Sequence, residues 1–449
     1  MRILVLAPQV PWPLQQGTAI RNYHVLRLLS ARHTVTLVAF GEAQTDVRPL
    51  EALGIHVLVV PSPPRRALAV RLLDLATTAV PDLARRLDSA AMTDRLRTLI
   101  SAPPERSSAE SDRPLPLFDV VQVEGLEMAV HGLMAANLLT AVGPVGHAPK
   151  LLYDAHNAEW VLQARAWEAD RRRGPAGWPG AVYSWIQARK LRRFERRLLD
   201  RADLTVAVSE ADAEALGMLS STPPLRSSSP STSDFKPRSK LGPPLVIANG
   251  VDTDAYAVAD PAAIEPGLCV FTGKMDFRPN IDAVAWLCSE VWPLVRAGYP
   301  AARLAIVGRD PARRVLALAG EGLGVTVTGA VPEVQPWLAR AAAVVVPLRV
   351  GGGTRLKVLE AMAAGKAIAA TRLAVEGLHV VDGVDALLAD QAEDLAAAIL
   401  RLLADPGLRA ELGMRARARA ETEYRWPTIL APLMRLYDDW QRSVDTSNA

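Results

Sequence analysis

The chain has 449 residues, and half of them are hydrophobic, which is enough for two domains of roughly 200 residues each. The formal net charge is only +3, so the overall balance does not favour nucleic acid as a partner. The two cysteines, Cys269 and Cys288, form no metal-binding pattern and favour a reducing compartment.

The first residues are expected to form a strand and not a targeting segment. Residues 1–6 are too few for the apolar core of a signal peptide, and Pro8 and Pro11 follow at once. The longest uncharged stretch, between Glu127 and Lys150, contains histidines, prolines and glycines, which disfavours a membrane-spanning helix. We therefore expect a cytoplasmic protein.

Strands alternate with helical segments along the first half. The expected strands are Arg2–Ala7, Val35–Phe40, His56–Val60, Asp119–Val123, the stretch from Leu151, and Ala202–Ser209, with helices at Ile20–Ala31 and over most of 68–100, broken at Pro81. This alternation is typical of a parallel α/β sheet. Two segments rich in Pro and Ser, about 102–116 and 220–244, are expected to be flexible insertions.

A polar cluster follows the strand that begins at Leu151. Asp154, His156, Asn157 and Glu159 stand close together there. Ligands of parallel α/β sheets bind beyond the carboxyl ends of strands, where a histidine can donate a hydrogen bond or transfer a proton. His156 is therefore a candidate functional residue, the alternative being a histidine that only caps a helix.

The segment from Arg165 to Arg201 is strongly basic and contains three tryptophans. Such a segment could lie on anionic lipid headgroups, which predicts a peripheral contact with the inner face of a membrane. Nucleic-acid binding lacks a recognised module here, and an ordinary solvated helix face remains the alternative.

The second half repeats the alternation of strands and helices from about residue 263. Its expected strands are Cys269–Thr272, Arg303–Gly308, Val325–Gly329, Ala341–Pro347, Ala367–Thr371 and one within Asp382–Asp390, with late helices at 394–405, 406–424 and 427–444. The turn after the first of these strands begins Gly273-Lys274 and reaches Arg278. If this turn and the later glycine turn lie at the same edge of the sheet, Lys274 and Arg278 are placed to neutralise a diphosphate; solvated side chains are the alternative.

The stretch from Val350 to Gly377 is the most informative part of the chain. Three glycines, Gly351–Gly353, follow a buried strand, and Thr354 is the expected N-cap of a helix from Arg355 to Ala364. Such a turn directs backbone N–H groups and the positive end of the helix dipole at one point, which favours phosphate. Arg355 and Lys357 in the first turn oppose the dipole unless an anion is bound there; pairing of Lys357 with Glu360 is the alternative.

The sequence G-G-T-R-L-K-V-L-E-A-M-A-A-G-K resembles the donor-binding segment of retaining, nucleotide-sugar-dependent glycosyltransferases of family 4. The stretches A-D-L-T-V-A-V-S and N-G-V-D are further landmarks of that family. The resemblance implies the GT-B fold, α/β, with two doubly wound Rossmann-like domains facing across a cleft. The expected domains are 1–262 for the acceptor, 263–426 for the nucleotide sugar, and a helix over 427–449 that crosses back.

The resemblance also implies roles for individual residues. Glu360 would bind the ribose hydroxyls, and His156 would contact the transferred sugar. Asn157, from the same polar cluster, is a further candidate for substrate binding. Gly17 would lie near the diphosphate and the acceptor. The family has a glutamate where this chain has Gly352, which leaves the donor sugar open. The residues expected around the leaving diphosphate are Gly273, Lys274, Arg278, Gly352, Gly353, Thr354, Arg355 and Lys357.

We therefore expect a transferase that moves a sugar from a nucleoside-diphosphate sugar to a glycan or lipid-linked acceptor. The resemblance implies retention of anomeric configuration and a role in bacterial surface polysaccharide or exopolysaccharide assembly. We expect no cofactor and no metal, because no aspartate constellation marks a metal site and cationic side chains can neutralise the diphosphate. A sugar-nucleotide epimerase and a non-catalytic nucleotide-sugar-binding homologue are the alternatives.

Overall fold

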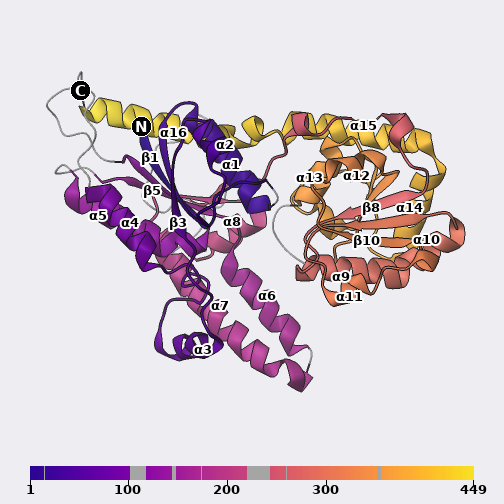
Figure 1. Ribbon diagram of the computed structural model, residues 1–449, viewed down its shortest axis with the longest axis horizontal. Coiled ribbons are helices and arrows are strands. Elements are labelled where there is room, and N and C mark those ends of the chain that lie inside the picture. The colour runs from indigo at the N-terminus through magenta and orange to yellow at the C-terminus, as the bar shows by residue number, and fades with distance from the viewer. Residues whose placement is uncertain are drawn as a thin grey trace. The chain divides into compact units, whose positions relative to one another are not determined.

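The computed structural model describes residues 1–14, 16–101, 118–143, 148–172, 174–219, 243–258, 260–350 and 355–448. The chain forms two compact units, residues 1–248 with 430–449 and residues 249–429 (Figure 1). The boundary expected at 262/263 lies inside the second unit, because Val251 forms a parallel bridge with Arg425 and its N–H donates to Tyr424. Both expected insertions, apart from residues 243 and 244, lie outside the described residues.

The first unit is built on a seven-stranded parallel sheet of order β3-β2-β1-β4-β5-β6-β7. Its strands are β1 (Arg2–Ala7), β2 (Thr34–Gly41), β3 (His56–Pro61), β4 (Val120–Glu124), β5 (Lys150–Ala155), β6 (Leu204–Ala207) and β7 (Leu245–Val246). The central strands are nearly continuous runs of buried apolar residues, as expected of a parallel sheet covered on both faces. The predicted parallel α/β class is confirmed.

Helices of the first unit connect these strands. They are α1 (Gly17–Ser30), α2 (Arg48–Glu51), α3 (Leu68–Thr77), α4 (Ala90–Ser101), α5 (Ala129–Val142), α6 (Glu159–Arg171), α7 (Trp178–Leu199) and α8 (Glu210–Gly217). The first helix begins at Gly17, three residues before the expected start. The stretch expected to be mostly helical over 68–100 is two separate helices, because residues 78–89 between them are not helical.

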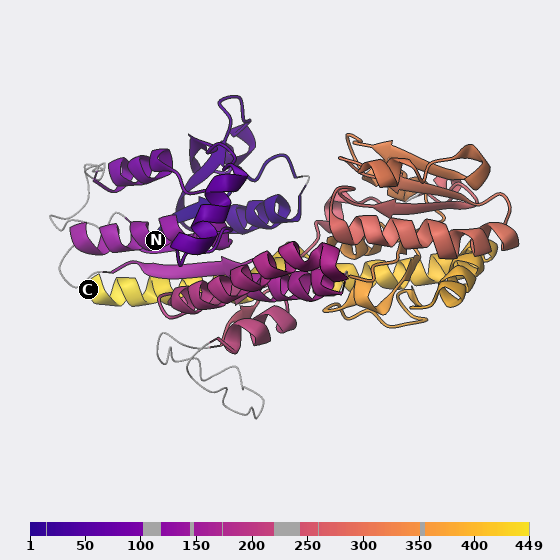
Figure 2. The ribbon, with the colours of Figure 1, turned by 90° about the horizontal axis from the view of Figure 1, so that it is seen from below.

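The basic segment 165–201 belongs to a helical hairpin of α6 and α7, which lie side by side in Figures 1 and 2. The buried Glu195 of α7 accepts hydrogen bonds from the backbone N–H groups of Glu159 and Trp160, at 2.9 and 3.0 Å. These N–H groups begin α6 and have no partner within that helix, so the carboxylate stabilises its start.

The second unit has a six-stranded parallel sheet of order β10-β9-β8-β11-β12-β13, with helices on both faces (Figure 1). Its strands are β8 (Leu268–Thr272), β9 (Arg303–Val307), β10 (Val325–Gly329), β11 (Ala343–Val346), β12 (Ile368–Ala370) and β13 (Leu387–Leu388). Its helices are α9 (Arg278–Trp286), a π-helical turn (Leu287–Val291), α10 (Trp292–Gly298), α11 (Arg313–Leu316), α12 (Gln335–Arg340), α13 (Leu356–Ala363), α14 (Ala392–Ala404) and α15 (Pro406–Glu423).

The last helix, α16 (Trp426–Asn448), begins in the second unit and continues into the first. Leu430, Leu433 and Tyr437 are fully buried, and the Tyr437 hydroxyl donates to Gln122 of β4. Both cysteines are free thiols. None of the described helices combines the length and apolarity needed to span a bilayer.

Candidate functional site

In the second unit, the predicted phosphate-binding elements lie at one edge of the sheet. Strands β8 and β11 are parallel neighbours, so the turn after β8 and the start of α13 meet beyond their carboxyl ends. The amino group of Lys357, in the first turn of α13, lies 2.6 Å from Oδ1 of Asn280 in α9. The two elements that the sequence places around a phosphate are therefore in contact.

The turns after β8 and β9 each require a glycine, Gly273 and Gly308. A Cβ atom on Gly308 would lie 1.7 Å from the carbonyl oxygen of Gly273, so the two backbones touch. A Cβ atom on Gly273 would lie 2.7 Å from Nδ2 of Asn280 and 3.0 Å from Nζ of Lys357. Any side chain at Gly273 would therefore occupy the space beside the Lys357 ammonium, where a phosphate oxygen would approach.

Asn280 links Lys357 to the turn after β8 through two hydrogen bonds. Its side chain is buried, its Nδ2 donates to the Lys274 carbonyl at 2.9 Å, and its Oδ1 accepts from Lys357. The ammonium also lies 4.2 Å from the centre of the Phe271 ring, a favourable cation–π contact. Burial lowers the pKa of Lys357 to about 7, with Glu360 opposing that change. The i,i+3 salt bridge to Glu360 is not among the ion pairs of the described residues.

The other predicted cations occupy different environments. Arg355 is the residue before α13 and not part of its first turn; its side chain is buried, with Nη2 3.4 Å from Glu376. Lys274 is half-exposed and pairs with Asp276 at 3.0 Å. Arg278 is the exposed first residue of α9 and makes no hydrogen bond or ion pair with the described residues. Gly352, Gly353 and Thr354 lie outside the described residues.

Glu360, the predicted ribose ligand, is partly buried in the middle of α13. The hydroxyl of Tyr256, a residue that the sequence did not single out, lies beside the carboxyl group of Glu360. Burial raises the pKa of Glu360, although Tyr256 and the charge of Lys357 oppose the change. The oxygens of a carboxyl group can form hydrogen bonds with the hydroxyl groups of a ribose.

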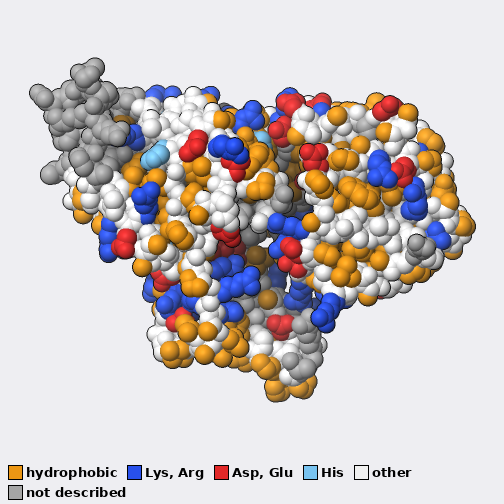
Figure 3. Space-filling view, viewed as in Figure 1, with side chains coloured by type: hydrophobic (Ala, Val, Ile, Leu, Met, Phe, Trp, Pro, Cys, Tyr) orange, Lys and Arg blue, Asp and Glu red, His pale blue; other side chains and the backbone are white. Residues whose placement is uncertain are grey.

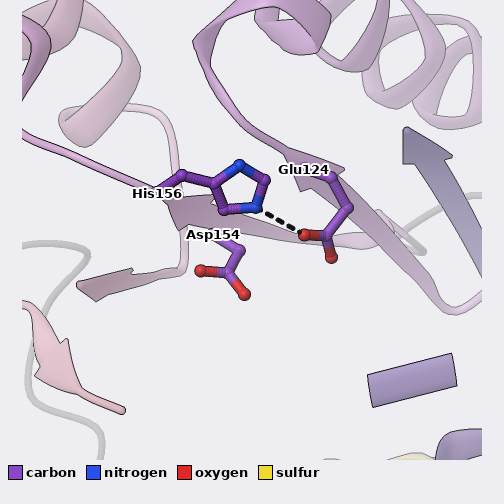
Figure 4. A group of neighbouring side chains, drawn as sticks. All are labelled: Glu124, Asp154 and His156. Atoms are coloured by element: carbon purple, nitrogen blue, oxygen red, sulfur yellow. Dashed lines mark hydrogen bonds and ion pairs between the residues drawn. The ribbon is translucent and has the colours of Figure 1, made fainter. Parts of the chain in front are cut away.

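In the first unit, His156 belongs to a buried polar network (Figure 4). Its Nε2 lies 3.1 Å from Oε2 of Glu124, at the end of β4, and Gln122 donates to the other oxygen of Glu124 at 2.5 Å. Burial alone would lower the pKa of His156, but the hydrogen bond to Glu124 and the charge of Asp154 raise it overall. The hydrogen bond to Glu124 also fixes the orientation of the imidazole. Glu124 was missed because nothing in the sequence pairs it with His156.

Glu124, Asp154 and His156 form a cluster that could in principle hold a metal ion. Their potential ligand atoms all lie within 4.8 Å of one another. Both oxygens of Asp154, however, accept from the buried guanidinium of Arg21, at 3.0 and 3.1 Å. The guanidinium compensates the Asp154 charge, and the Glu124 oxygens already accept hydrogen bonds. This donor set fits a closed ion-pair network better than a divalent cation.

A pocket of about 320 Å³ opens beside His156 and Asn157. It is lined by polar residues that include Gln16, Thr18, Arg86, Glu127 and Glu159. Burial and the nearby charge of Glu127 raise the pKa of Glu159 to about 7. Gly17 begins α1 between two lining residues, so α1 and the ends of β4 and β5 together shape this pocket. Its carboxyl, amide and imidazole groups are suited to sugar hydroxyls.

Parts of the sequence are similar to known proteins. Residues 266–405 match the family model described as glycosyl transferases group 1. A phosphatidyl-myo-inositol mannosyltransferase of Mycolicibacterium smegmatis is 32% identical over 200 residues, which is 43% of this chain and 51% of that protein. The chain thus aligns with about half the length of that curated relative.

Solved structures resemble the chain over almost its whole length. The Anabaena protein Alr3699/HepE, solved in complex with UDP and glucose, has a TM-score of 0.62 at 15% identity, covering 98% of this chain and 100% of that one. Sucrose-phosphate synthase from Thermosynechococcus elongatus has a TM-score of 0.65 at 17% identity, covering 99% and 100%. The chain has the GT-B fold. The prediction of two Rossmann-like sheets is therefore confirmed.

Proposed function

We propose that this GT-B chain is a glycosyltransferase that moves a sugar from a nucleoside-diphosphate sugar to a hydroxyl of a glycan or lipid-linked acceptor. The main support is the ammonium of Lys357, fixed by Asn280 beside the Gly273 backbone. A fixed cation next to a glycine turn is suited to a diphosphate. The match of residues 266–405 to glycosyl transferases group 1 supports the same reading.

In the proposed reaction, the bond between the anomeric carbon and the diphosphate breaks, the acceptor oxygen bonds to that carbon, and the acceptor proton passes to an oxygen of the leaving diphosphate. Negative charge grows on the leaving diphosphate, where Lys357, Lys274 and Arg278 would stabilise it. Glu360 would hold the ribose hydroxyls. Retention of configuration and independence from metal and cofactor are parts of this proposal.

The first unit would supply the acceptor side of the reaction. His156 and Asn157 line the polar pocket, and Glu127 and Glu159 offer carboxylate oxygens to hydroxyl groups. One similar protein is named a phosphatidyl-myo-inositol mannosyltransferase, and phosphatidyl-myo-inositol is a lipid. This name supports a lipid-linked acceptor for the present chain. We place the activity in the cytoplasm, at the inner face of the membrane, in surface polysaccharide or exopolysaccharide assembly.

The decisive experiment is nucleotide release from a panel of UDP-, GDP- and ADP-sugars, with and without a lipid-linked sugar acceptor. We expect release of nucleoside diphosphate only when acceptor is present. An altered sugar without release would indicate an epimerase, and binding without either change would indicate a non-catalytic homologue. Either result would contradict the proposal.

The role of Lys357 is tested by Lys357→Met in the same assay. We expect turnover to fall about 100-fold, because a buried cation beside the leaving group is lost. Lys150→Met is the matched control, since Lys150 is a half-exposed lysine of the first unit that pairs with Asp203 at 3.5 Å. Equal loss in both variants would contradict a specific role for Lys357.

A further inference from the structure

Helix α3 (Leu68–Thr77) presents its apolar side to solvent. None of its residues is buried, and Leu68 and Leu73 are 66% and 62% exposed. Leu72 and Val70 are exposed as well. Surface helices of globular proteins usually turn such a face toward the core, so this helix has the opposite orientation.

Ion pairs on its polar side hold α3 in this orientation. Asp74 accepts from Arg66 and from Arg85, each at 2.7 Å. Arg71 pairs with Asp82 at 3.1 Å and donates to the hydroxyl of Tyr183 in α7. A rotation of α3 that turned its leucines inward would break all of these contacts. The ion pairs therefore stabilise the orientation in which the apolar side faces solvent.

The end of α3 is also fixed to α7. The amino group of Lys190 donates to the backbone carbonyls of Asp74 and Leu75, at 3.0 and 2.7 Å. These carbonyls belong to the last turn of α3, and that of Asp74 also accepts from the backbone N–H of Thr78 at 3.2 Å. A cation at this end of a helix is favourable. Helix α3 therefore lies on α7 as one rigid surface.

Helix α7 carries an exposed apolar stripe of its own, which ends in cations. Trp178, Val182 and Trp185 are exposed, and at the same helical spacing they are followed by the exposed Arg189, Arg192 and Arg196. The Arg189 guanidinium lies 3.7 Å from the centre of the Trp185 ring. Figure 3 shows apolar side chains gathered at the lower end of the first unit, with Lys and Arg side chains just above them.

The positive charge of this surface indicates what kind of partner it would bind. Between residues 159 and 201 the sequence has eleven Lys and Arg against five Asp and Glu, although the whole chain is close to neutral. A second copy of this surface would bring like charges together, whereas an anionic bilayer offers an apolar interior beneath phosphate groups. Tryptophan beside an apolar helix suits the interface between headgroups and acyl chains.

We propose that α3 is a membrane-inserting element: Leu68, Leu72 and Leu73 enter the acyl boundary of an anionic bilayer while α7 places Trp178 and Trp185 at headgroup level. Arg189, Arg192 and Arg196 bind lipid phosphates. The inference extends the membrane contact proposed from the basic segment and names the element that inserts. It does not depend on the transferase activity.

The test is flotation of the full chain with vesicles of phosphatidylcholine alone or mixed with phosphatidylglycerol, without any sugar nucleotide. We expect association with the anionic vesicles only. The triple variant Leu68→Ser/Leu72→Ser/Leu73→Ser should weaken this association about tenfold or more. The matched control is Leu316→Ser/Leu323→Ser/Met414→Ser, which changes three similarly exposed apolar residues of the second unit.

Several results would overturn the proposal. One is equal association of the α3 triple variant and the wild type; another is equal loss in the control. A third is a dimer in sedimentation that the α3 triple variant abolishes, since the face would then bind a second copy. Donor binding is measured separately, so failure here is distinguishable from failure of the proposed transferase activity.

Discussion

At the scale of single residues, Lys357 is a lysine whose charge depends on pH near neutrality. Burial lowers its pKa to about 7, well below the usual value for lysine. Phosphate groups bound beside it would favour the charged form. Binding of a diphosphate above that pKa must therefore be coupled to uptake of a proton.

This coupling predicts the pH dependence of donor affinity. Below about pH 7 the ammonium is already charged, so affinity should be nearly constant; above it, affinity should fall by up to about tenfold per pH unit. Lys357→Arg should remove the fall, because a guanidinium keeps its charge. Calorimetric titration of a nucleoside-diphosphate sugar between pH 6 and 8.5 measures both. The same slope in both proteins would contradict the assignment.

His156 offers a second test at this scale. Its pKa is raised by Glu124 and Asp154 against the effect of burial. Glu124→Gln removes one of the two negative charges, so the pKa of His156 should fall below its wild-type value. An NMR titration of the imidazole measures it. Glu423→Gln, a carboxylate of the second unit, should leave that pKa unchanged; an unaltered pKa in Glu124→Gln would show that another group controls His156.

At the scale of elements, α16 supports the site through a chain of polar contacts. The hydroxyl of Tyr437 donates to Gln122, Gln122 donates to Glu124, and Glu124 bonds to His156. All but His156 are fully buried. A helix near the end of the sequence therefore takes part in orienting a residue of the β5 loop.

Tyr437→Phe tests this support. It leaves the buried Oε1 of Gln122 without its donor, so the free energy of unfolding should fall by about 1–3 kcal/mol. Urea unfolding measures it. The control is Tyr23→Phe, since the Tyr23 hydroxyl makes no hydrogen bond with the described residues. If the free energy of unfolding changed equally in both variants, the polar network would make no specific contribution to stability.

At the scale of the whole molecule, the sequence predicted the strands well and the partners of the site residues poorly. Buried parallel strands are continuous apolar runs, so most strands were placed within a residue or two. Two short strands were exceptions: β7 was not among the expected strands, and only Leu387–Leu388 of β13 pairs within the expected Asp382–Asp390. The tip of α13 was also misplaced, because Arg355 precedes the helix.

Long-range pairs explain what sequence reasoning missed. Asn280 and Lys357 are separated by 77 residues, and Arg21 and Asp154 by 133. Neither pair has a local pattern, because their contact exists only once the sheets bring strand ends together. The inverted orientation of α3 is similar: its leucines predict a helix, but only the ion pairs of Asp74 and Arg71 decide which side faces out.

The path of α16 also affects the order in which the two units can fold during synthesis. Residues 249–429 leave the ribosome as one uninterrupted stretch, whereas the first unit needs residues 430–449 to fill the space around Tyr437. The later-encoded unit can thus complete its folding while the earlier one still waits for its final helix. Nascent chains halted before residue 430 would expose the incomplete face of the first sheet to chaperones.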